Sequence, residues 1–355
     1  MNQNTIADIR VMVLAAGAGT RLRPLTYRIP KPLIPIVNMP VMEHSINNFH
    51  KQGFRKFMCN LHTHAGLIKN YFGSGKKFGV SMEYSFEKNL LGNAGGLKKV
   101  ENFFKGSGTL LVISGDGFTD IDIRKAIAFH RKKKSVATMV LKKVQSVFPF
   151  GITVTSPAGK IKKFMEKPDI TDFVDATVNT GIYIFEHDIF KFIPNHNFFD
   201  FGKDLWPLLL KKGLPIYGYV TDAYWCDVGN LADYRRTVAD VLDGRVNIRI
   251  PGEERQGSVW CEKNVRVGKN VKFYRPCLIG ADSEIGDGAK IGPFVTIGRG
   301  SKIGPAAVVK NSIIWNNARI ESGVKIKNCI IDSGAAIKEN LTLYEGAVIN
   351  TEDRK

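Results

Sequence analysis

The chain has 355 residues, of which 44% are hydrophobic and 24% are charged, and its 51 Lys and Arg against 33 Asp and Glu give a formal net charge of +18. This mixture excludes a disordered chain, and no apolar run reaches the roughly 20 residues that cross a bilayer. The N-terminus does not resemble a signal peptide, and the five cysteines are scattered without a C-x-x-C pair. We therefore expect a two-domain cytoplasmic protein with an anionic partner, which nucleic acid, a membrane surface or a phosphorylated substrate could each supply.

The first part of the chain alternates short β-branched segments with longer amphipathic ones. Strands are expected at residues 11–16, 56–61, 109–114, 137–141 and 182–185, and helices at 41–52, 123–134 and 234–242. This alternation predicts an α/β fold with a Rossmann-like mixed, mostly parallel sheet. Ligands of such sheets bind beyond the carboxyl ends of the strands.

A different pattern begins near residue 258. A hydrophobic residue recurs every six positions from Val267 to Ile349, and the register slips by one residue before Ile314 and again before Ile331. A six-residue period with small residues at the corners is typical of a left-handed parallel β-helix of hexapeptide repeats, here with about five coils. We predict a first domain at 1–245, a linker at 246–257 and a β-helix at 258–355, and we expect the β-helix to assemble copies of the chain.

A glycine-rich segment follows the first expected strand. Gly17 and Gly19 let the backbone approach a ligand, and consecutive backbone amides there can bind an anion. The segment is neither a G-x-G-x-x-G motif nor a P-loop. Arg21 adds positive charge, and Lys31 stands between two prolines, where we expect an extended, stiff backbone outside any helix. These residues predict a phosphate-binding site.

Six motifs in this order are similar to the signature of sugar-1-phosphate nucleotidyltransferases, which join a nucleoside triphosphate to a sugar 1-phosphate and release pyrophosphate. The motifs lie at residues 14–32, 91–96, 114–116, 164–168 together with Gly151, 179–183 and 224–229. The resemblance covers nearly all of residues 11–242, and a β-helix follows in many members of the family. It implies a nucleotidyltransferase domain, a nucleoside triphosphate and a sugar 1-phosphate as partners, and no nucleic acid or membrane.

The resemblance also implies roles for particular residues. The nucleotide would contact Leu14, Ala15, Ala16, Gly17, Gly19, Thr20, Arg21, Gly92, Asn93, Gly95 and Asp116, and the sugar phosphate Gly151, Glu166, Lys167 and Asn179. Arg21, Lys31 and Lys167 would be catalytic, and Asp116 and Asp227 would hold Mg²⁺, which binds through one or two carboxylates plus substrate oxygens. An alternative for Asp116 is that its side chain only caps the following turn.

Within the family, the motifs look most like those of mannose-1-phosphate guanylyltransferases, so we predict GTP and mannose 1-phosphate as substrates and GDP-mannose as product. Heptose or glucose 1-phosphate, and dTTP, UTP or ATP, remain alternatives. Many relatives have two glycines where this chain has Ala16 and Gly17, and Thr where it has Asn93. The Asn93 difference bears on contacts to the base and so on nucleotide preference.

Two other classes of function are also open. Acyl transfer on the β-helix is disfavoured because no histidine follows His196, and a non-catalytic regulatory or scaffold subunit is disfavoured because the expected catalytic residues are present. Structural explanations are favoured for three further features: the pair His62 and His64, the run 132–134 at a helix end, and Asp120 with Asp122, which we expect to cap the helix beginning at Ile123.

Overall fold

The computed structural model describes residues 5–144, 151–166, 176–195, 197–255 and 257–348, and the following account concerns these residues. Contacts between residues divide the chain into two units. The first unit contains Met1–Ala18, Pro30–Pro32 and Met42–Asp227, and the second contains Gly19–Ile29, Leu33–Val41 and Val228–Lys355. The predicted boundary near residue 245 stays a prediction.

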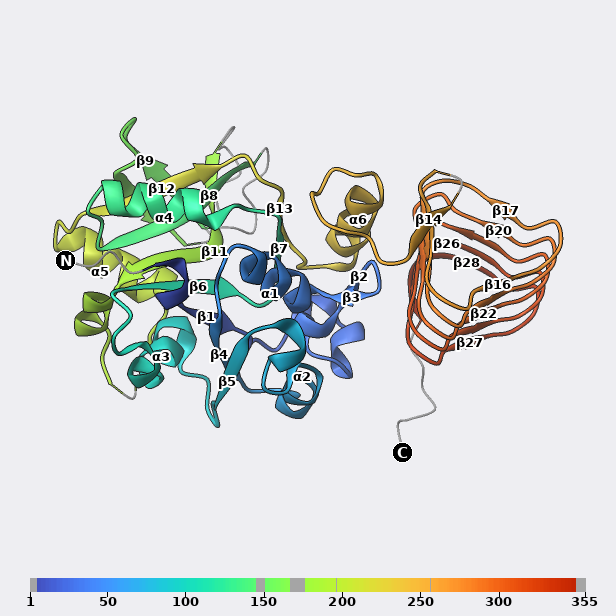
Figure 1. Cartoon of the computed structure of the whole chain (residues 1–355), viewed down its shortest axis with the longest axis horizontal. Coiled ribbons are helices and arrows are strands. Elements are labelled where there is room, and N and C mark those ends of the chain that lie inside the picture. Colours follow the sequence, from blue (N-terminus) through green and yellow to red (C-terminus); the bar gives the residue numbers. More distant parts are fainter. Residues whose placement is uncertain (1–4, 145–150, 167–175, 196, 256, 349–355) are drawn as a thin grey trace. The chain divides into compact units, whose positions relative to one another are not determined.

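The first unit is built on a nine-stranded sheet (Figure 1). Its strands are β1 (Arg10–Leu14), β4 (Lys56–Leu61), β5 (Ser81–Phe86), β6 (Thr109–Ser114), β8 (Ala137–Val144), β9 (Ile152–Thr155), β10 (Ile161–Met165), β11 (Ala176–Glu186) and β12 (Ile216–Thr221). Strands β6, β1, β4 and β5 run parallel to one another, whereas β11 is antiparallel to β6 and to β8. The predicted mixed sheet is confirmed.

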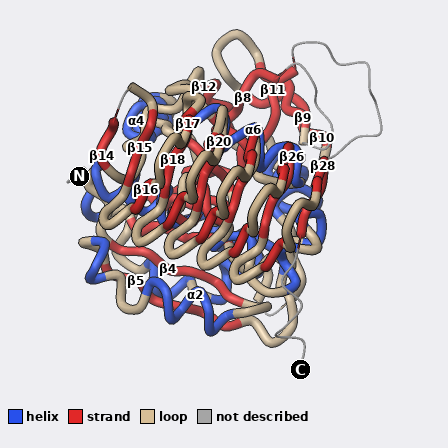
Figure 2. Tube along the Cα trace, turned by 90° about the vertical axis from the view of Figure 1, so that its right-hand side faces the viewer, coloured by secondary structure: helices blue, strands red, loops and turns tan. Residues whose placement is uncertain are grey.

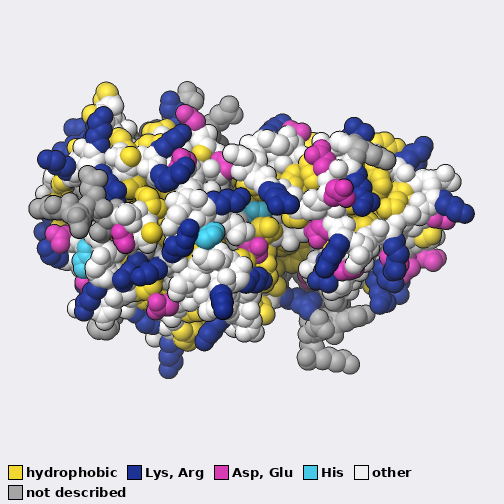
Figure 3. Space-filling model, viewed as in Figure 1, with side chains coloured by type: hydrophobic (Ala, Val, Ile, Leu, Met, Phe, Trp, Pro, Cys, Tyr) yellow, Lys and Arg dark blue, Asp and Glu magenta, His cyan; other side chains and the backbone are white. Residues whose placement is uncertain are grey.

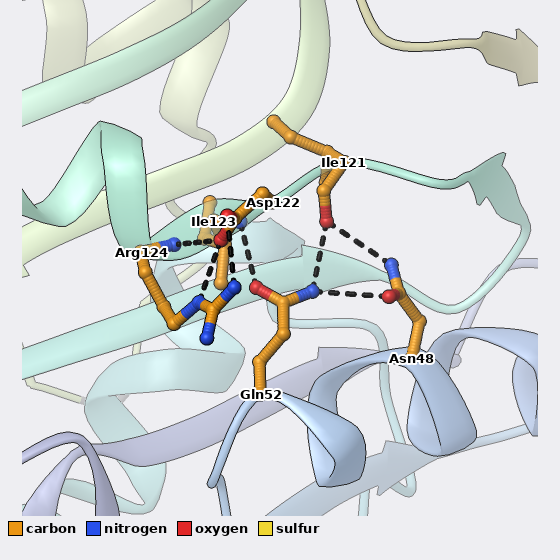
Figure 4. A network of polar contacts seen from close by, with 6 residues as sticks. All are labelled: Asn48, Gln52, Ile121, Asp122, Ile123 and Arg124. Atoms are coloured by element: carbon orange, nitrogen blue, oxygen red, sulfur yellow. Dashed lines mark hydrogen bonds and ion pairs between the residues drawn. The ribbon is translucent and has the colours of Figure 1, made fainter. Parts of the chain in front are cut away.

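Helices accompany the sheet at α1 (Val41–Lys51), α2 (Ala65–Phe72), α3 (Gly92–Lys99), α4 (Ile123–Lys132) and α5 (Trp206–Lys211), and a single π-helical turn, η8 (Phe201–Leu205), precedes α5. A polar network fixes the start of α4 against the end of α1 (Figure 4). Gln52 donates to the Ile121 carbonyl over 2.8 Å and accepts from the Ile123 amide over 2.8 Å. Asp122 caps the helix by accepting from the Arg124 amide, as predicted. Asp120 does not share this role, because its carboxylate accepts from the Tyr224 amide at 2.8 Å.

The second unit contains the predicted β-helix, whose coils lie side by side in Figure 2. Its strands are β14 (Glu253–Arg255), β15 (Val259–Cys261), β16 (Arg266–Val267), β17 (Lys272–Phe273), β18 (Cys277–Ile279), β19 (Glu284–Ile285), β20 (Lys290–Ile291), β21 (Val295–Ile297), β22 (Lys302–Ile303), β23 (Val308–Lys310), β24 (Ile313–Ile314), β25 (Arg319–Ile320), β26 (Lys325–Ile331), β27 (Ala336–Ile337) and β28 (Thr342–Val348). Strands from successive coils pair in parallel, so that equivalent side chains stack inside the prism.

The predicted six-residue repeat forms the three interior stacks. They contain Val267, Ile285, Ile303, Ile320 and Ile337; then Phe273, Ile291, Val309, Ile326 and Leu343; and then Cys261, Ile279, Ile297, Ile314, Ile331 and Val348. The residue that stacks on Ile331 in the next coil is therefore Val348. The expected residue was Ile349, one position later, which lies outside the described residues. The register slips a third time because the last coil is shortened in the same way as the two coils before it.

Segments from earlier in the chain cover one face of the β-helix. Leu278, Ile313 and Ile330 point away from the interior of the coils, yet at most 3% of each is exposed. Within the same unit, helix α6 (Leu231–Leu242) contributes Tyr234, whose hydroxyl accepts from the Trp315 indole over 3.0 Å. The short strands β2 (Pro35–Ile36) and β3 (Met39–Pro40) belong to this unit as well. The coils thus form one folded body with α6 and with segments on either side of Lys31.

Candidate active site

A lysine and two aspartates meet at one point of the first unit. The Lys31 ammonium lies 2.6 Å from an oxygen of Asp116 and 2.6 Å from an oxygen of Asp227. The Lys31 side chain is 7% exposed, whereas Asp116 and Asp227 are 31% and 20% exposed. Two carboxylates that converge on one cation, with part of their surface open to solvent, are also the arrangement that a divalent cation needs.

Sheet topology explains why these distant residues meet. Strand β1 pairs with β6 so that Leu14 lies beside Ser114, and Asp116 follows two residues later. A second, two-stranded sheet joins β7 (Gly117–Thr119) to β13 (Trp225–Asp227) in antiparallel register, with Asp227 opposite Gly117. Asp116 and Asp227 therefore occupy neighbouring positions at the carboxyl end of β6, where α/β sheets bind their ligands.

The electrostatics of the cluster favour its charged form. Burial by itself would lower the pKa of the Lys31 ammonium, but the charges of Asp116 and Asp227 outweigh burial and raise that pKa above its ordinary value. Burial would likewise raise the pKa of the Asp116 carboxyl, but the Lys31 charge and the Ser114 hydroxyl lower it below its ordinary value. Both groups are therefore charged at neutral pH. The alternative that Asp116 caps the following turn stays open.

Lys31 lies in a single 3-10 turn, Lys31–Leu33, so the expectation that it would stand outside any helix is wrong. Pro32 is tolerated there because the first turn of a helix does not use the amide proton that proline lacks. The expectation of a stiff backbone stays a prediction, and the Lys31 side chain is buried.

Two buried side chains connect the glycine-rich segment to the predicted base-reading segment. Asn60 accepts a hydrogen bond from the Ala15 amide at 2.8 Å and donates one to Glu87 at 2.8 Å. The second oxygen of Glu87 accepts from the Leu91 amide at 3.0 Å, directly before α3. Asn60 and Glu87 are 3% and 1% exposed. They hold the end of β1 and the start of α3 at a fixed separation.

Replacing Asn60 by Ala should lower the free energy of unfolding by about 2–3 kcal/mol, because the buried Ala15 amide and the Glu87 carboxylate would each lose a partner. Urea unfolding measures this change. Asn70→Ala is the matched control, since Asn70 is exposed on α2, and should change the free energy by less than about 0.5 kcal/mol. Equal effects of the two substitutions would contradict the role given to Asn60.

The predicted base-reading residues form the first turn of α3. Gly92 has a φ of +72°, and a Cβ atom there would lie 2.5 Å from the Phe199 carbonyl oxygen. The same oxygen accepts from the amides of Ala94 and Gly95 at 3.0 and 2.9 Å. Asn93 is exposed on this turn. The backbone here is fixed by the 197–199 segment, and Asn93 presents its side chain to solvent.

The predicted sugar-phosphate residues also come together. The Asn179 amide donates to the Gly151 carbonyl at 2.9 Å, and a Cβ atom on Gly151 would lie 3.1 Å from a Glu166 oxygen. The Asn179 side chain donates to the Tyr183 hydroxyl over 2.7 Å. Lys167 lies outside the described residues.

The remaining nucleotide-site candidates fall in different places. Leu14, Ala15, Ala16 and Gly17 follow one another at the end of β1, and the space where Gly17 would carry a Cβ atom is open. Gly19, with a φ of +62°, Thr20 and the exposed Arg21 belong to the second unit, where the Thr26 hydroxyl donates to the Gly19 carbonyl over 2.7 Å. The roles of all the candidates in binding and catalysis stay predictions.

Sequence reasoning missed three residues of this region: Asn60, Glu87 and Gly202. Gly202, in η8, would bring a Cβ atom to 2.3 Å from a Glu166 oxygen, so only glycine leaves room for that carboxylate. The position of Asn60 at the end of an expected parallel strand was a signal that could have identified it. Glu87 and Gly202 carry no such signal, because Asn60, which contacts Glu87, and Glu166, which lies beside Gly202, are far away in the sequence.

His62 and His64 do not share a strand face. The His62 ring contacts the Glu87 carbonyl at 2.8 Å, and His64 has a φ of +53° at the start of α2. Within the described part of the chain, no group of three or more His, Cys, Asp or Glu side chains could hold a metal ion. In the same part, no helix is long and apolar enough to span a membrane.

Comparison with known proteins identifies the class to which this fold and site belong. A family model described as "Nucleotidyl transferase" matches residues 10–244, and the chain is a member of that family. A second model, "EIF2B subunit epsilon LbH domain", matches residues 256–353, in agreement with the predicted β-helix of hexapeptide repeats.

Individual relatives resemble the chain over most of its length. A UTP–glucose-1-phosphate uridylyltransferase from Synechocystis is 39% identical over 93% of this chain and 90% of its own length. A mannose-1-phosphate guanylyltransferase from Mycobacterium tuberculosis is 28% identical over 92% of this chain and 83% of its own length. The crystal structure of a candidate glucose-1-phosphate thymidylyltransferase from Bacillus anthracis, in complex with sucrose, has a TM-score of 0.60 at 26% identity and covers 68% of this chain and 97% of that one.

Proposed function

We propose that this chain is a Mg²⁺-dependent sugar-1-phosphate nucleotidyltransferase. An oxygen of the sugar phosphate attacks the α-phosphorus of a nucleoside triphosphate, the bond from that phosphorus to the bridging oxygen breaks, and pyrophosphate leaves. The observation that carries the proposal is the convergence of Asp116 and Asp227 on Lys31 at the carboxyl end of β6. Membership of the nucleotidyl transferase family supports it.

The chain's own residues would act by position and charge. Lys31 is held charged beside the two carboxylates, so its ammonium can neutralise phosphate oxygens as negative charge moves onto the leaving group. Glu166 and Asn179 lie at a common site around Gly151, where a carboxylate and an amide can orient sugar hydroxyls. Arg21 and Lys167 are proposed to bind phosphates on the basis of the family resemblance.

The two aspartates fit a magnesium ion. Their oxygens each lie within 2.6 Å of one position, now held by the Lys31 ammonium, and two carboxylates completed by substrate oxygens are a common set of Mg²⁺ ligands. Bound there, the ion would supply charge neutralisation at the phosphates. The pKa of the Asp116 carboxyl is already lowered by the Lys31 charge, so Asp116 can take part without losing a proton.

Two pairs of substrates are proposed for testing. Likeness to the Synechocystis enzyme, at 39% identity, favours UTP with glucose 1-phosphate, whereas the motif combination and the 28% identical Mycobacterium enzyme favour GTP with mannose 1-phosphate. Asn93 is exposed at the start of α3. We expect substitutions of this side chain to change the preference for one nucleotide base over another.

A panel of UTP, GTP, dTTP and ATP against glucose, mannose and heptose 1-phosphates, with pyrophosphate release as the readout, tests the proposal. Turnover with one pair at kcat/KM at least tenfold above the others would assign the substrates. If no pair is turned over, the enzyme proposal fails in favour of a regulatory subunit of the same architecture.

Replacing Gly202 by Ala should raise the KM for the sugar phosphate about tenfold while kcat and Tm change little. The new methyl group would displace the Glu166 carboxylate, which can move at low cost because it ends a flexible side chain. Steady-state kinetics with the sugar phosphate varied measures the effect. Gly66→Ala is the control, since a Cβ atom there meets nothing within 4 Å. An unchanged KM in Gly202→Ala would argue against Glu166 as a sugar ligand.

We also propose that the chain forms a homo-oligomer, because the β-helix presents strand faces and coil ends that are suited to self-association. Light scattering on the intact chain at several concentrations tests this. Truncation before the coils is a poor test, because α6 and the 33–41 segment would lose their packing partners within the second unit.

A further inference from the structure

A groove lies in the second unit at the corner where the last coils are shortened. In the early coils, six residues separate neighbouring interior positions such as Phe273 and Ile279, whereas five separate Val309 from Ile314. The corner that follows Ile326 is shortened in the same way. Because the register is kept, equivalent side chains of these corners stack in adjacent coils.

The shortened corners place two lysines and two asparagines in a ladder. Lys310 and Lys327 are Cα partners in β23 and β26, and both are exposed. Next to them, the Asn311 side chain donates to Asn328 over 2.6 Å. This ladder forms one wall of a cavity of about 550 Å³.

Helix α6 forms the opposite wall. Ala232, Arg235, Arg236 and Ala239 line the cavity, and their spacing places them on one face of the helix. Ala232 and Ala239 have small side chains that leave room between the helix and the coils. Arg235 and Arg236 lie between these two alanines along the helix. Phe294 adds an aromatic side chain to the lining.

Positive charge exceeds negative charge in this groove. Arg235 has a carboxylate partner in Glu345 at 3.4 Å, and Arg236 has one in Asp233 at 2.7 Å. Glu345 also accepts from Asn328 over 2.7 Å.

The two lysines are not neutralised by ion pairs within the described part of the chain. The Lys327 ammonium lies 5.2 Å from the centre of the Tyr344 ring, and Lys310 has no interaction of its side chain there. Lys and Arg are spread over the whole face drawn in Figure 3, so charge alone does not mark a site. The groove differs because four cationic side chains line one open hollow of about 550 Å³.

We propose that this groove binds a small phosphorylated compound at a second site, separate from the residues assigned to catalysis. Its volume lies within the range of small-molecule pockets, which is about 300–1,000 Å³. Lysine ammonium and arginine guanidinium groups are the usual partners of phosphate oxygens, and neutral asparagine amides beside them can bind sugar or base atoms. The proposal does not depend on which substrates the catalytic residues take.

Hydrogen exchange on the intact chain, with inorganic phosphate as the probe, tests the proposal locally. Phosphate should slow exchange in peptides covering residues 231–242 and 308–331. In the double variant Lys310→Gln/Lys327→Gln, the phosphate concentration for half-maximal protection should rise by about tenfold or more, since two charged hydrogen-bond donors are lost. Phosphate bound near Lys31 would be detected in other peptides and would not be confused with this effect.

Lys272→Gln/Lys290→Gln is the matched control. These lysines are exposed partners on the same sheet but do not line the groove, and the control should keep the protection of the original chain. Absence of protection in the groove peptides, or equal losses in both double variants, would overturn the proposal. Protection by a single-stranded oligonucleotide but not by phosphate would also overturn it, and would indicate a polymer as the ligand.

Discussion

Replacement of Asp227 by Asn should reduce kcat for pyrophosphate release by about 10³-fold. Removal of one group that stabilises the charge of a transition state typically has an effect of about this size. Asparagine keeps the size of the side chain but removes one of the two charges that converge on Lys31. A divalent cation at this position would then have a single carboxylate ligand from the chain. Steady-state assays with the best substrate pair of the panel measure the effect.

Asp222→Asn is the control for this substitution. Asp222 is exposed just after β12 and lies five residues before Asp227 in the chain, so its replacement changes net charge equally. We expect its kcat to stay within about twofold of the original chain, because a distant surface charge is screened by solvent and salt. Comparable losses in the two variants, or an Asp227→Asn protein with full activity, would remove Asp227 from the catalytic site.

Replacement of Lys31 by Met should have a large effect on both activity and stability. Without the ammonium, the Asp116 and Asp227 carboxylates face each other with no cation between them, and the free energy of unfolding should fall by about 1–3 kcal/mol in metal-free buffer. Turnover should fall by about 10²–10³-fold, since a positive charge at the leaving phosphates is lost. Thermal unfolding with and without Mg²⁺ separates the two effects.

Magnesium should raise the Tm of Lys31→Met more than that of the original chain, because the ion can occupy the position between the two carboxylates without competition from the ammonium. This readout does not need substrate or activity. Lys142→Met is a suitable control, because Lys142 contacts backbone carbonyls of Asp222 and Ala223 rather than a carboxylate. Identical magnesium shifts in all three proteins would contradict a metal site at Asp116 and Asp227.

The sequence predicted the parts of the fold that local pattern determines. The expected strands at 56–61 and 109–114 have the bounds of β4 and β6, because most residues of each are apolar and buried. The six-residue repeat located the β-helix because its interior aliphatic side chains recur with that period. The helix α3 was not expected, since glycines at 95 and 96 disfavour helices. Its first turn is instead fixed by contacts with Glu87 and with the Phe199 carbonyl.

The candidate site was predictable to a smaller extent. Motif resemblance singled out Lys31, Asp116 and Asp227, but their meeting depends on the pairing of β7 with β13, which joins segments about a hundred residues apart. Glu87 precedes a lysine and looks like part of a solvated charged pair, so local sequence gave no reason to expect it to be buried. Long-range contacts of this kind have no local signature.

The shortened corner of the last coils has a consequence for how such a domain can change in length. Seventeen residues separate Ile314 from Ile331, and seventeen separate Ile331 from Val348, whereas eighteen separate Ile279 from Ile297. The strands stay in register where the corner changes from six residues, between Ile291 and Ile297, to five, between Val309 and Ile314. This corner can therefore lose a residue without any change in strand pairing, and a duplicated coil of seventeen or of eighteen residues would keep the interior stacks.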